Sequence, residues 1–249
     1  MKFFLDSSRF IDTKFPLDLS IGLRDQEDNP RAWYVNAPKF EPVRTEHYTG
    51  SVAEGGTVNF RDIFFNPHGH GTHTECLGHI TEEVYSINDR LQEYFFEAQV
   101  ISIEPKTVIN GSDEDRVITL EQMKPIEIHK EALILRTLPN ASEKQSFNYS
   151  DTNPAYLEKE IARYLIDQGV KHFLLDLPSV DRESDGGALA FHHAFWEVPE
   201  NPNHERTITE LIYVPDGIAD GVYLLSLQVA PFENDAAPSR PVLYEIQEK

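Results

Sequence analysis

The chain has very little cysteine and few basic residues for its size. Its 249 residues include one cysteine, so no internal disulfide can form, which agrees with a reducing compartment. Lysine and arginine number 22 against 42 aspartates and glutamates, a formal net charge of -20. Nucleic acids and anionic membrane surfaces are bound chiefly by clustered Lys and Arg, so this composition argues against both as partners.

Long apolar runs are also absent. Residues 1–15 hold no apolar stretch long enough for a secretory signal, and no other stretch approaches a transmembrane span. We therefore expect a cytoplasmic protein. A hydrophobic share of 40%, with 15 Phe and 10 Tyr, is ample for a globular core, and one α/β or barrel-like domain is ordinary at this length.

Histidine is concentrated in one place. Residues 66–80, NPHGHGTHTECLGHI, hold four of the ten histidines, one acidic residue and the only cysteine. Each imidazole can offer a lone pair to a divalent metal, and Glu75 can add an oxygen. If the segment is extended, its side chains alternate between two faces. One face then bears His73, Glu75 and His79, and the other bears His68 and His70.

Short patterns typical of strands and turns occur through the rest of the chain. We expect strands at residues 16–23, 99–103, 132–137, 170–177, 207–213 and 221–229. Residues 215–217, Pro-Asp-Gly, have turn chemistry. Thr119 followed by Gln122 is the pattern of a capping box and predicts a short helix.

A longer helix is expected between two of these strands. Asn153 and Pro154 supply an N-cap and a first-turn proline, leucine or isoleucine recurs every four residues over 157–165, and Gly169 supplies the stop. Strand, helix and strand over 132–177 form a βαβ unit. The chain is therefore expected to be one mixed α/β domain.

Residues 24–54 form a long polar stretch that contains four aromatic residues, too many for a plain linker. These are Trp33, Tyr34, Phe40 and Tyr48. We expect a loop region that covers a pocket, in which the aromatic rings suit a flat substrate; ordinary surface packing is the alternative.

Three other places have residue types that suit chemistry. Asp176 and Ser179 lie where the expected strand 170–177 ends, which is where α/β folds place functional loops, although a stabilised turn is the simpler interpretation. His192 lies among aromatic residues, where a packed core histidine is the commoner outcome. Glu210 lies in an apolar run and is costly to bury unless paired or protonated, which makes it a candidate acid, base or ligand.

The histidine cluster and several other segments form one ordered pattern. Residues 71–79 read GTHTECLGH, and the other segments are 18–21, 133–137, 169–181, 191–192, 208–211 and 235–240. Together they resemble the cyclase family of metal-dependent hydrolases, which includes bacterial kynurenine formamidase and isatin hydrolase. The family signature is His-x-Gly-Thr-His-x-Asp-x-Pro-x-His, and the resemblance is colinear over residues 16–245.

This resemblance implies a swivelling β/β/α fold in a single domain over residues 1–249. It also implies a homodimer or homotetramer, and a divalent Zn or Mn ion at the signature. By position, His73 and Glu75 become metal ligands, and His79 a further ligand or the proton shuttle. His192 and Glu210 become a general acid/base pair, or ligands of a second ion. We further expect Trp33, Asp176 and Ser179 to contact the substrate.

Three positions depart from the family pattern. Gly69 stands where the family has its first histidine. His68 or His70 must replace that ligand, and either can reach the metal face only if the backbone kinks or bulges at a glycine. Glu75 replaces the usual Asp and Leu77 replaces Pro.

The implied activity is hydrolysis of an amide or cyclic amide, such as an N-formyl aryl amine or a lactam, by a metal-activated water. The alternative is that Gly69 marks a degraded metal site and the chain is a small-molecule binding or structural protein. A thiol enzyme built on Cys76 is a poor third interpretation, because no resolving cysteine exists and strand alternation turns Cys76 away from His73.

Overall fold

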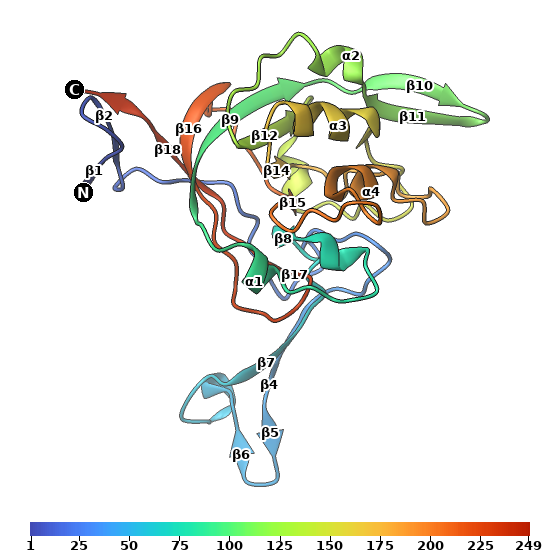
Figure 1. Cartoon of the computed structure of the whole chain (residues 1–249). Helices are drawn as coiled ribbons and strands as arrows, with labels where there is room; N and C mark the ends of the chain where they lie inside the picture. The colour runs from blue at the N-terminus through green and yellow to red at the C-terminus, as the bar shows by residue number, and fades with distance from the viewer.

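A curled mixed sheet of nine strands forms the centre of the computed structural model, which describes all residues 1–249 (Figure 1). In spatial order the strands are β17 (Ala236–Pro238), β8 (His73–Glu75), β15 (Thr207–Glu210), β14 (His172–Leu175), β12 (Ala132–Thr137), β9 (Phe95–Ile103), β16 (Gly221–Ser226), β18 (Val242–Glu245) and β3 (Leu17–Asp18). Strands β15, β14, β12 and β9 are parallel, and antiparallel strands extend the sheet on both sides. The expected mixed α/β class is confirmed.

The parallel centre of the sheet follows from continuous apolar runs. Every residue of β12 and β14 is buried, as expected of parallel strands covered on both faces. The two strands pair in parallel, with Ala132 opposite His172, and α3 (Glu160–Asp167) connects them. The predicted βαβ unit is therefore confirmed.

Four α-helices and three short 3-10 turns complete the regular structure. They are α1 (Ile87–Arg90), α2 (Leu120–Met123), α3, α4 (Ala190–Trp196), η1 (Val52–Glu54), η2 (Leu77–His79) and η3 (Ser142–Gln145). Helices α3 and α4 lie beside each other against the parallel strands (Figure 1). Thr119 and Gln122 form the predicted capping box at the start of α2.

Helix α3 starts later than the sequence pattern indicated. Residues 156–157 form a short strand, β13, that pairs in parallel with β11 (Asp113–Ile118). Asn153 is not an N-cap, because its backbone lies in the left-handed region at φ 46°. The expected start at residue 153 is therefore wrong: cross-strand pairing competes with the helix until Glu160. Gly169, at φ 81°, follows the helix as expected.

Smaller sheets lie outside the central one. The chain termini meet in a sheet of β1 (Lys2–Phe4), β2 (Arg9–Asp12) and β19 (Gln247–Glu248), and β10 (Lys106–Asn110) forms a hairpin with β11. Residues 39–64 form a projection that we call the arm. It consists of the pair β4 (Lys39–Pro42) and β7 (Arg61–Phe64), followed by the pair β5 (Arg44–Thr45) and β6 (Tyr48–Thr49), and extends away from the body (Figure 1).

The arm divides the segment 24–54 that was expected to cover a pocket. Phe40 and Tyr48 belong to the arm, whereas Trp33 packs against a small buried cluster of the body and the Tyr34 hydroxyl contacts Glu183. Two of the four aromatic residues thus lie away from the central sheet.

One hydrophobic core unites the strands and helices. A cluster of 40 buried apolar residues includes Leu133 of β12, Phe173 of β14, Ile161 of α3 and Trp196 of α4, so the layers share one interior. No helix has the length and apolar character needed to cross a membrane.

Candidate metal centre

Strands β8 and β15 place three ionisable side chains on one face of the sheet. The strands are antiparallel, with His73 opposite Glu210 and Glu75 opposite Ile208. Thr74 and Thr209 face the other way and join their hydroxyls at 2.8 Å. Strand alternation therefore brings the side chains of His73, Glu75 and Glu210 together in the interior, where each is almost completely buried.

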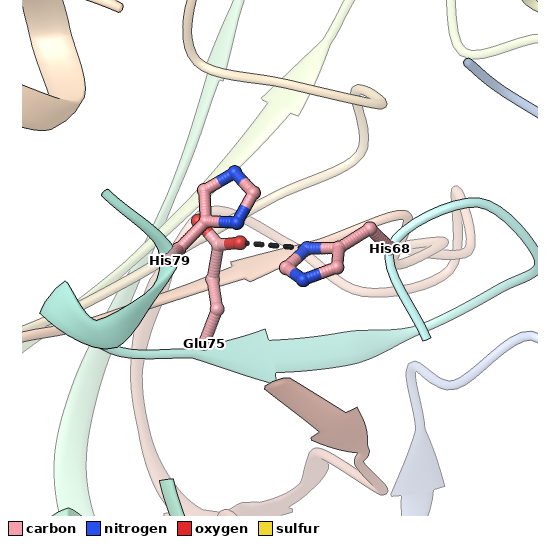
Figure 2. Close-up of side chains that lie close together, drawn as sticks. All are labelled: His68, Glu75 and His79. Atoms are coloured by element: carbon pink, nitrogen blue, oxygen red, sulfur yellow. Dashed lines mark ion pairs between the residues drawn. The ribbon is translucent and has the colours of Figure 1, made fainter. Parts of the chain in front are cut away.

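His68 reaches this group from a loop. The strand β8 is only three residues long, so the alternation expected over residues 66–80 does not extend to His68. The backbone turns at Gly71, with φ 153°, and brings His68 Nδ1 to 3.0 Å from Glu75 Oε2 (Figure 2). His79 arrives through the turn η2, and its ring stacks on that of His68 with centroids 4.2 Å apart.

His70 points elsewhere. Its Nδ1 accepts a hydrogen bond from the Asn66 backbone at 2.7 Å, and its Nε2 donates to the Asn36 carbonyl at 2.6 Å. Backbone groups thus occupy both ring nitrogens. Of the two histidines beside Gly69, the structure brings His68 to the cluster and leaves His70 outside it.

Gly69 has no space for a side chain. A Cβ there would lie 2.8 Å from Val35 Cγ2 and 3.2 Å from the Ala32 carbonyl oxygen. The Ala32 amide also donates to the Gly69 carbonyl at 3.0 Å. Residues 32–35 therefore press directly on the position where the family has its histidine.

Three histidines each direct one ring nitrogen at an oxygen acceptor. The pairs are His73 Nδ1 with Gly71 O at 3.0 Å, His192 Nδ1 with Asp181 Oδ2 at 2.6 Å, and His68 Nε2 with Asp235 Oδ2 at 2.8 Å. The second nitrogen of each ring faces a carboxylate: His73 with Glu210 at 3.4 Å, His192 with Glu75 at 3.1 Å, and His68 with Glu75 at 3.0 Å. In metal-binding imidazoles, one ring nitrogen commonly donates to a carboxylate or carbonyl while the other binds the metal.

Two buried atoms at the centre of the cluster lack hydrogen-bond partners. They are His73 Nε2 and Glu75 Oε2, each close to opposite groups but aligned with none of them. Buried polar atoms are normally satisfied. Ligand atoms lie within 4.8 Å of one another in two groups, His68 with Glu75 and His79, and His73 with Glu75 and Glu210. Nitrogen and carboxylate donors at this spacing fit a divalent ion such as Zn or Mn.

The pKa values of the cluster reflect a strongly negative interior. Burial disfavours a charged imidazole, yet the nearby carboxylates of Asp235 and Glu75 raise the pKa of His68 to about 10. Against the same burial penalty, Asp181 and Glu75 raise the pKa of His192 to about 10. Burial alone would raise the pKa of Glu75, but the neighbouring imidazoles hold it well below its usual value. The carboxylates thus attract positive charge to the place where a cation would bind.

A cavity of about 330 Å³ opens beside the cluster. Its walls include Trp33, Val35, His68, His79, Ser179 and His192. The structure therefore brings two of the three expected substrate-binding residues, Trp33 and Ser179, to one cavity. The volume suits a ligand of one or two small rings.

Asp176 does not reach this cavity. Its carboxylate is buried, accepts hydrogen bonds from the Thr137 backbone amide at 3.0 Å, and pairs with Lys144 Nζ at 2.7 Å. These contacts join the ends of β12 and β14. They correspond to the simpler, structural interpretation of the segment.

Asp181 and Asp235 are site residues to which sequence reasoning gave no role. Both were visible within segments that resemble the family, 169–181 and 235–240. Asp181 contacts His192, and Asp235 contacts His68. Nothing local in the sequence indicates these pairings, because Asp235 and His68 lie far apart in the chain and no motif links Asp181 to His192.

Cys76 takes no part in the cluster. Its thiol donates to the Tyr85 carbonyl at 3.2 Å, and burial raises its pKa to about 12. A thiol at that pKa is a poor nucleophile.

Histidines and carboxylates gathered on a mixed sheet beside a cavity are the arrangement expected of a metal-dependent hydrolase. Residues 17–182 match the sequence profile of the Cyclase family, described as "Putative cyclase". The chain belongs to this family, and the resemblance expected from its motifs is confirmed.

Named relatives agree with this assignment. A kynurenine formamidase of Bacillus thuringiensis (strain Al Hakam) is 31% identical over 198 residues, covering 79% of this chain and 85% of that protein. A kynurenine formamidase of Bacillus cereus is 30% identical over 244 residues, covering 97% and 100%.

Solved structures show the same fold. A "predicted metal-dependent hydrolase" from Bacillus stearothermophilus has a TM-score of 0.64 at 18% identity, covering 92% of this chain and 98% of that one. Isatin hydrolase A from Labrenzia aggregata has a TM-score of 0.63 at 14% identity, covering 92% and 93%. The expected cyclase-like α/β fold is confirmed.

Proposed function

We propose that this chain is a metal-dependent amidohydrolase that cleaves an N-formyl aryl amine or opens a lactam. The observation that carries the proposal is the set of anchored histidines around Glu75, which leaves His73 Nε2 and Glu75 Oε2 buried without hydrogen bonds beside a cavity. The relatives named kynurenine formamidase support an amide as the scissile group.

We assign His68, His73 and Glu75 as ligands of a divalent ion, Zn or Mn, with His79 close enough to add a further nitrogen. His70, although a candidate from sequence, has both nitrogens engaged and is not assigned a ligand role. A divalent ion held there would lower the pKa of a water molecule and polarise an amide carbonyl.

His192 is the proposed proton carrier, with Glu210 as its partner. The Asp181 carboxylate fixes the ring by accepting from Nδ1 and from the backbone amides of Phe191 and His192. Nε2 then faces the carboxylates of Glu75 and Glu210, at 3.1 and 3.9 Å. A divalent ion beside Glu75 would offset the carboxylates that raise the pKa of this ring, so that Nε2 could accept a proton from the attacking water and return it to the leaving nitrogen.

The substrate is proposed to be a small aromatic amide. Trp33 offers a flat apolar wall to the cavity, and Ser179 is a polar residue of the same lining. Kynurenine formamidase and isatin hydrolase, the names of the relatives and of a structural neighbour, both describe enzymes of ring-bearing substrates.

The alternative, a degraded metal site in a binding or structural protein, is not favoured. The argument for a degraded site was that Gly69 stands where the family has a histidine ligand. His68 Nδ1 nevertheless lies 3.0 Å from Glu75 Oε2, so an imidazole is present at the cluster. A cytoplasmic location, and a homodimer or homotetramer, stay predictions that accompany the proposed function.

Three variants test the assignment. His73→Ala removes a proposed ligand, so we expect metal content measured by mass spectrometry and hydrolysis to fall together. His192→Gln removes the proton carrier, so we expect metal content to persist while kcat falls by about 10²–10⁴-fold. His193→Gln is the matched control, because His193 contacts the Val198 carbonyl outside the cluster, and it should retain both properties.

The substrates for this test are N-formyl anilides, lactams and lactones, each assayed with added Zn²⁺ or Mn²⁺. Hydrolysis that survives complete chelation, or a His73→Ala variant with normal metal content and activity, contradicts the proposal. Cleavage of lactones alone would place the enzyme in a different substrate class.

A further inference from the structure

Charged side chains line the mouth of the cavity beside the metal centre. The loop after β14 contributes three of them, Arg182, Glu183 and Asp185, and each is half-buried. Glu210 of the metal centre lines the same cavity and is almost completely buried. The cavity therefore leads from the buried metal centre to the partly exposed residues 182–185. A substrate whose amide lies at the metal centre would have its remaining groups near these charges.

The positive charge of Arg182 is neutralised within the protein. Its Nε donates to both carboxylate oxygens of Asp115 at 3.1 Å, and its Nη2 donates to Asp113 Oδ2 at 2.8 Å. Its Nη1 donates to the Ser184 carbonyl at 2.7 Å. Asp115 is completely buried, where salt screens a charge pair little. Arg182 is the only Lys or Arg of the lining, and its guanidinium is not free to bind a carboxylate of the substrate.

The carboxylates of Glu183 and Asp185 have neutral partners. Glu183 accepts hydrogen bonds from two backbone amides, at 2.7 and 2.9 Å, and from the Tyr34 hydroxyl at 3.2 Å. Asp185 accepts from the backbone amides of residues 187–189, at distances between 2.7 and 3.2 Å. These donors fix both carboxylates in place and leave their negative charges uncompensated.

Uncompensated carboxylates at the mouth favour a positively charged ligand. A cleft lined by charges of one sign attracts and concentrates ligands of the opposite sign. An ammonium group would gain a charge-assisted hydrogen bond from Glu183 or Asp185, because a carboxylate has about four acceptor sites and each of these uses three. A substrate carboxylate would be repelled by the same two groups, and repulsion of this kind is a common basis of specificity.

We propose that the substrate is an aryl amide that carries an ammonium group, and no carboxylate, on the side of its ring that faces Glu183 and Asp185. The proposal rests on the proposed function, because the amide must lie at the metal centre for the ring to extend towards the mouth. Trp33 lines the cavity, and the next residue, Tyr34, donates to Glu183, so the aromatic wall and the acidic mouth are adjacent. Glu183 and Asp185 then determine which amides bind and take no part in breaking the amide bond.

The first test compares N-formyl anilides that differ only in the para substituent, assayed with metal-loaded protein at low ionic strength. The substituents are aminomethyl, which is cationic at neutral pH, hydroxymethyl, which is neutral, and carboxymethyl, which is anionic. We expect kcat/KM for the aminomethyl compound to exceed that for the carboxymethyl compound at least about tenfold, mainly through KM. The neutral compound should lie between them, and added salt should reduce the difference. An α-amino acid substituent, which adds a carboxylate to the ammonium, should also fall below the aminomethyl compound.

Variants that remove charge locate the source of the preference. Glu183→Gln with Asp185→Asn removes both negative charges and keeps the side-chain size, so the aminomethyl to carboxymethyl ratio of kcat/KM should fall by at least about tenfold. Glu121→Gln with Glu127→Gln is the matched control, because it removes the same charge from two side chains outside the cavity that are 85% and 87% exposed. The control should keep the wild-type ratio. Circular dichroism and melting temperature check that both proteins remain folded.

Binding of the amine products gives a readout that does not depend on turnover. Isothermal titration calorimetry on the metal-loaded protein should show tighter binding of para-aminomethylaniline than of para-aminophenylacetate. The variant Glu183→Gln with Asp185→Asn should lose this difference.

Equal kcat/KM values for all the anilides, or a preference for the carboxymethyl compound, overturn the proposed charge selection and leave the amidohydrolase assignment intact. A preference for the aminomethyl compound that survives in Glu183→Gln with Asp185→Asn overturns it as well. Absence of hydrolysis of every anilide and lactam overturns the proposed function, and equal binding of the two amine products then overturns the charge selection too.

Discussion

At Gly69 the absence of a side chain is linked to the position of a neighbouring histidine. The family pattern has a histidine at this position, yet Val35 and the Ala32 carbonyl occupy the space that its Cβ would need. His68 takes up the place beside Glu75 from the preceding position, supported by Asp235. The presence of His68 beside Glu75 and the close packing of residues 32–35 against Gly69 therefore occur together at this position.

Gly69→Ala tests this coupling. The new Cβ would meet Val35 Cγ2 at 2.8 Å, so we expect the wall formed by Trp33 and Val35 to move outward. Overpacking of this kind typically lowers the unfolding free energy by about 1–3 kcal/mol. Because Trp33 lines the cavity, KM for an aryl formamide should rise more than kcat falls, as measured by steady-state kinetics.

Val35→Ala provides the control for the same experiment. It removes the atom nearest to the added Cβ, so the double variant Gly69→Ala with Val35→Ala should recover part of both KM and stability. Equal losses in the single and double variants would show that Val35 is not the obstacle.

At the scale of elements, pairing between strands determines which polar side chains are buried and which neighbours they contact. β14 and β15 place His172 beside Thr207, with Nδ1 2.9 Å from the hydroxyl, and the ring packs on Phe96. Burial, with a smaller contribution from Lys171, lowers the pKa of His172 to about 4. The folded protein therefore holds this imidazole in its neutral form.

The lowered pKa predicts acid sensitivity that begins well above pH 4. An unfolded histidine binds a proton near pH 6.5, so the stabilisation is fully present above that pH and is lost as the pH falls towards 4. Between pH 7 and 5 this group should cost about 2 kcal/mol of unfolding free energy. Urea titrations of wild type and His172→Asn at both pH values measure the difference.

His172→Asn cannot titrate, so its stability should fall by about 2 kcal/mol less than that of wild type over this range. His129→Asn is a suitable control, because His129 is exposed and should follow wild type. Identical pH slopes for wild type and His172→Asn would contradict a buried neutral imidazole.

At the scale of the whole molecule, the metal centre joins parts of the chain that are far apart in sequence. His68 and Glu75 come from the first third, His192 and Glu210 from the last third, and Asp235 from near the C-terminus. A ligand that contacts all of them binds the folded chain and not the unfolded one. Its binding free energy therefore adds to the stability of the entire fold.

Metal loading should accordingly raise the melting temperature. At 100 times the dissociation constant, a bound ion stabilises by about 2.7 kcal/mol, and each kcal/mol corresponds to roughly 2–4 °C in a chain of this length. We expect Zn²⁺ or Mn²⁺ to raise the melting temperature of chelator-treated protein by about 5–10 °C in calorimetry. His73→Ala should show a much smaller rise, and an equal rise in both would place the ion elsewhere.

The sequence by itself determined the class of fold, the βαβ unit, the capping box of α2 and the family. These depend on local chemistry: apolar periodicity, cap residues and the spacing of motifs along one strand. It also indicated His73, Glu75 and Glu210, because alternation in a strand and an acid in an apolar run are visible without any partner.

Only the tertiary structure brought His68 rather than His70 to Glu75, placed Asp181 and Asp235 against His192 and His68, moved the start of α3 to Glu160, and separated the arm from the body. Each of these depends on contacts between segments distant in the chain. A loop backbone bends where neighbouring segments leave space, and a residue such as Asn153 adopts the conformation that its strand neighbours impose. Such contacts leave no periodic signal in the sequence, since they are set by packing in three dimensions.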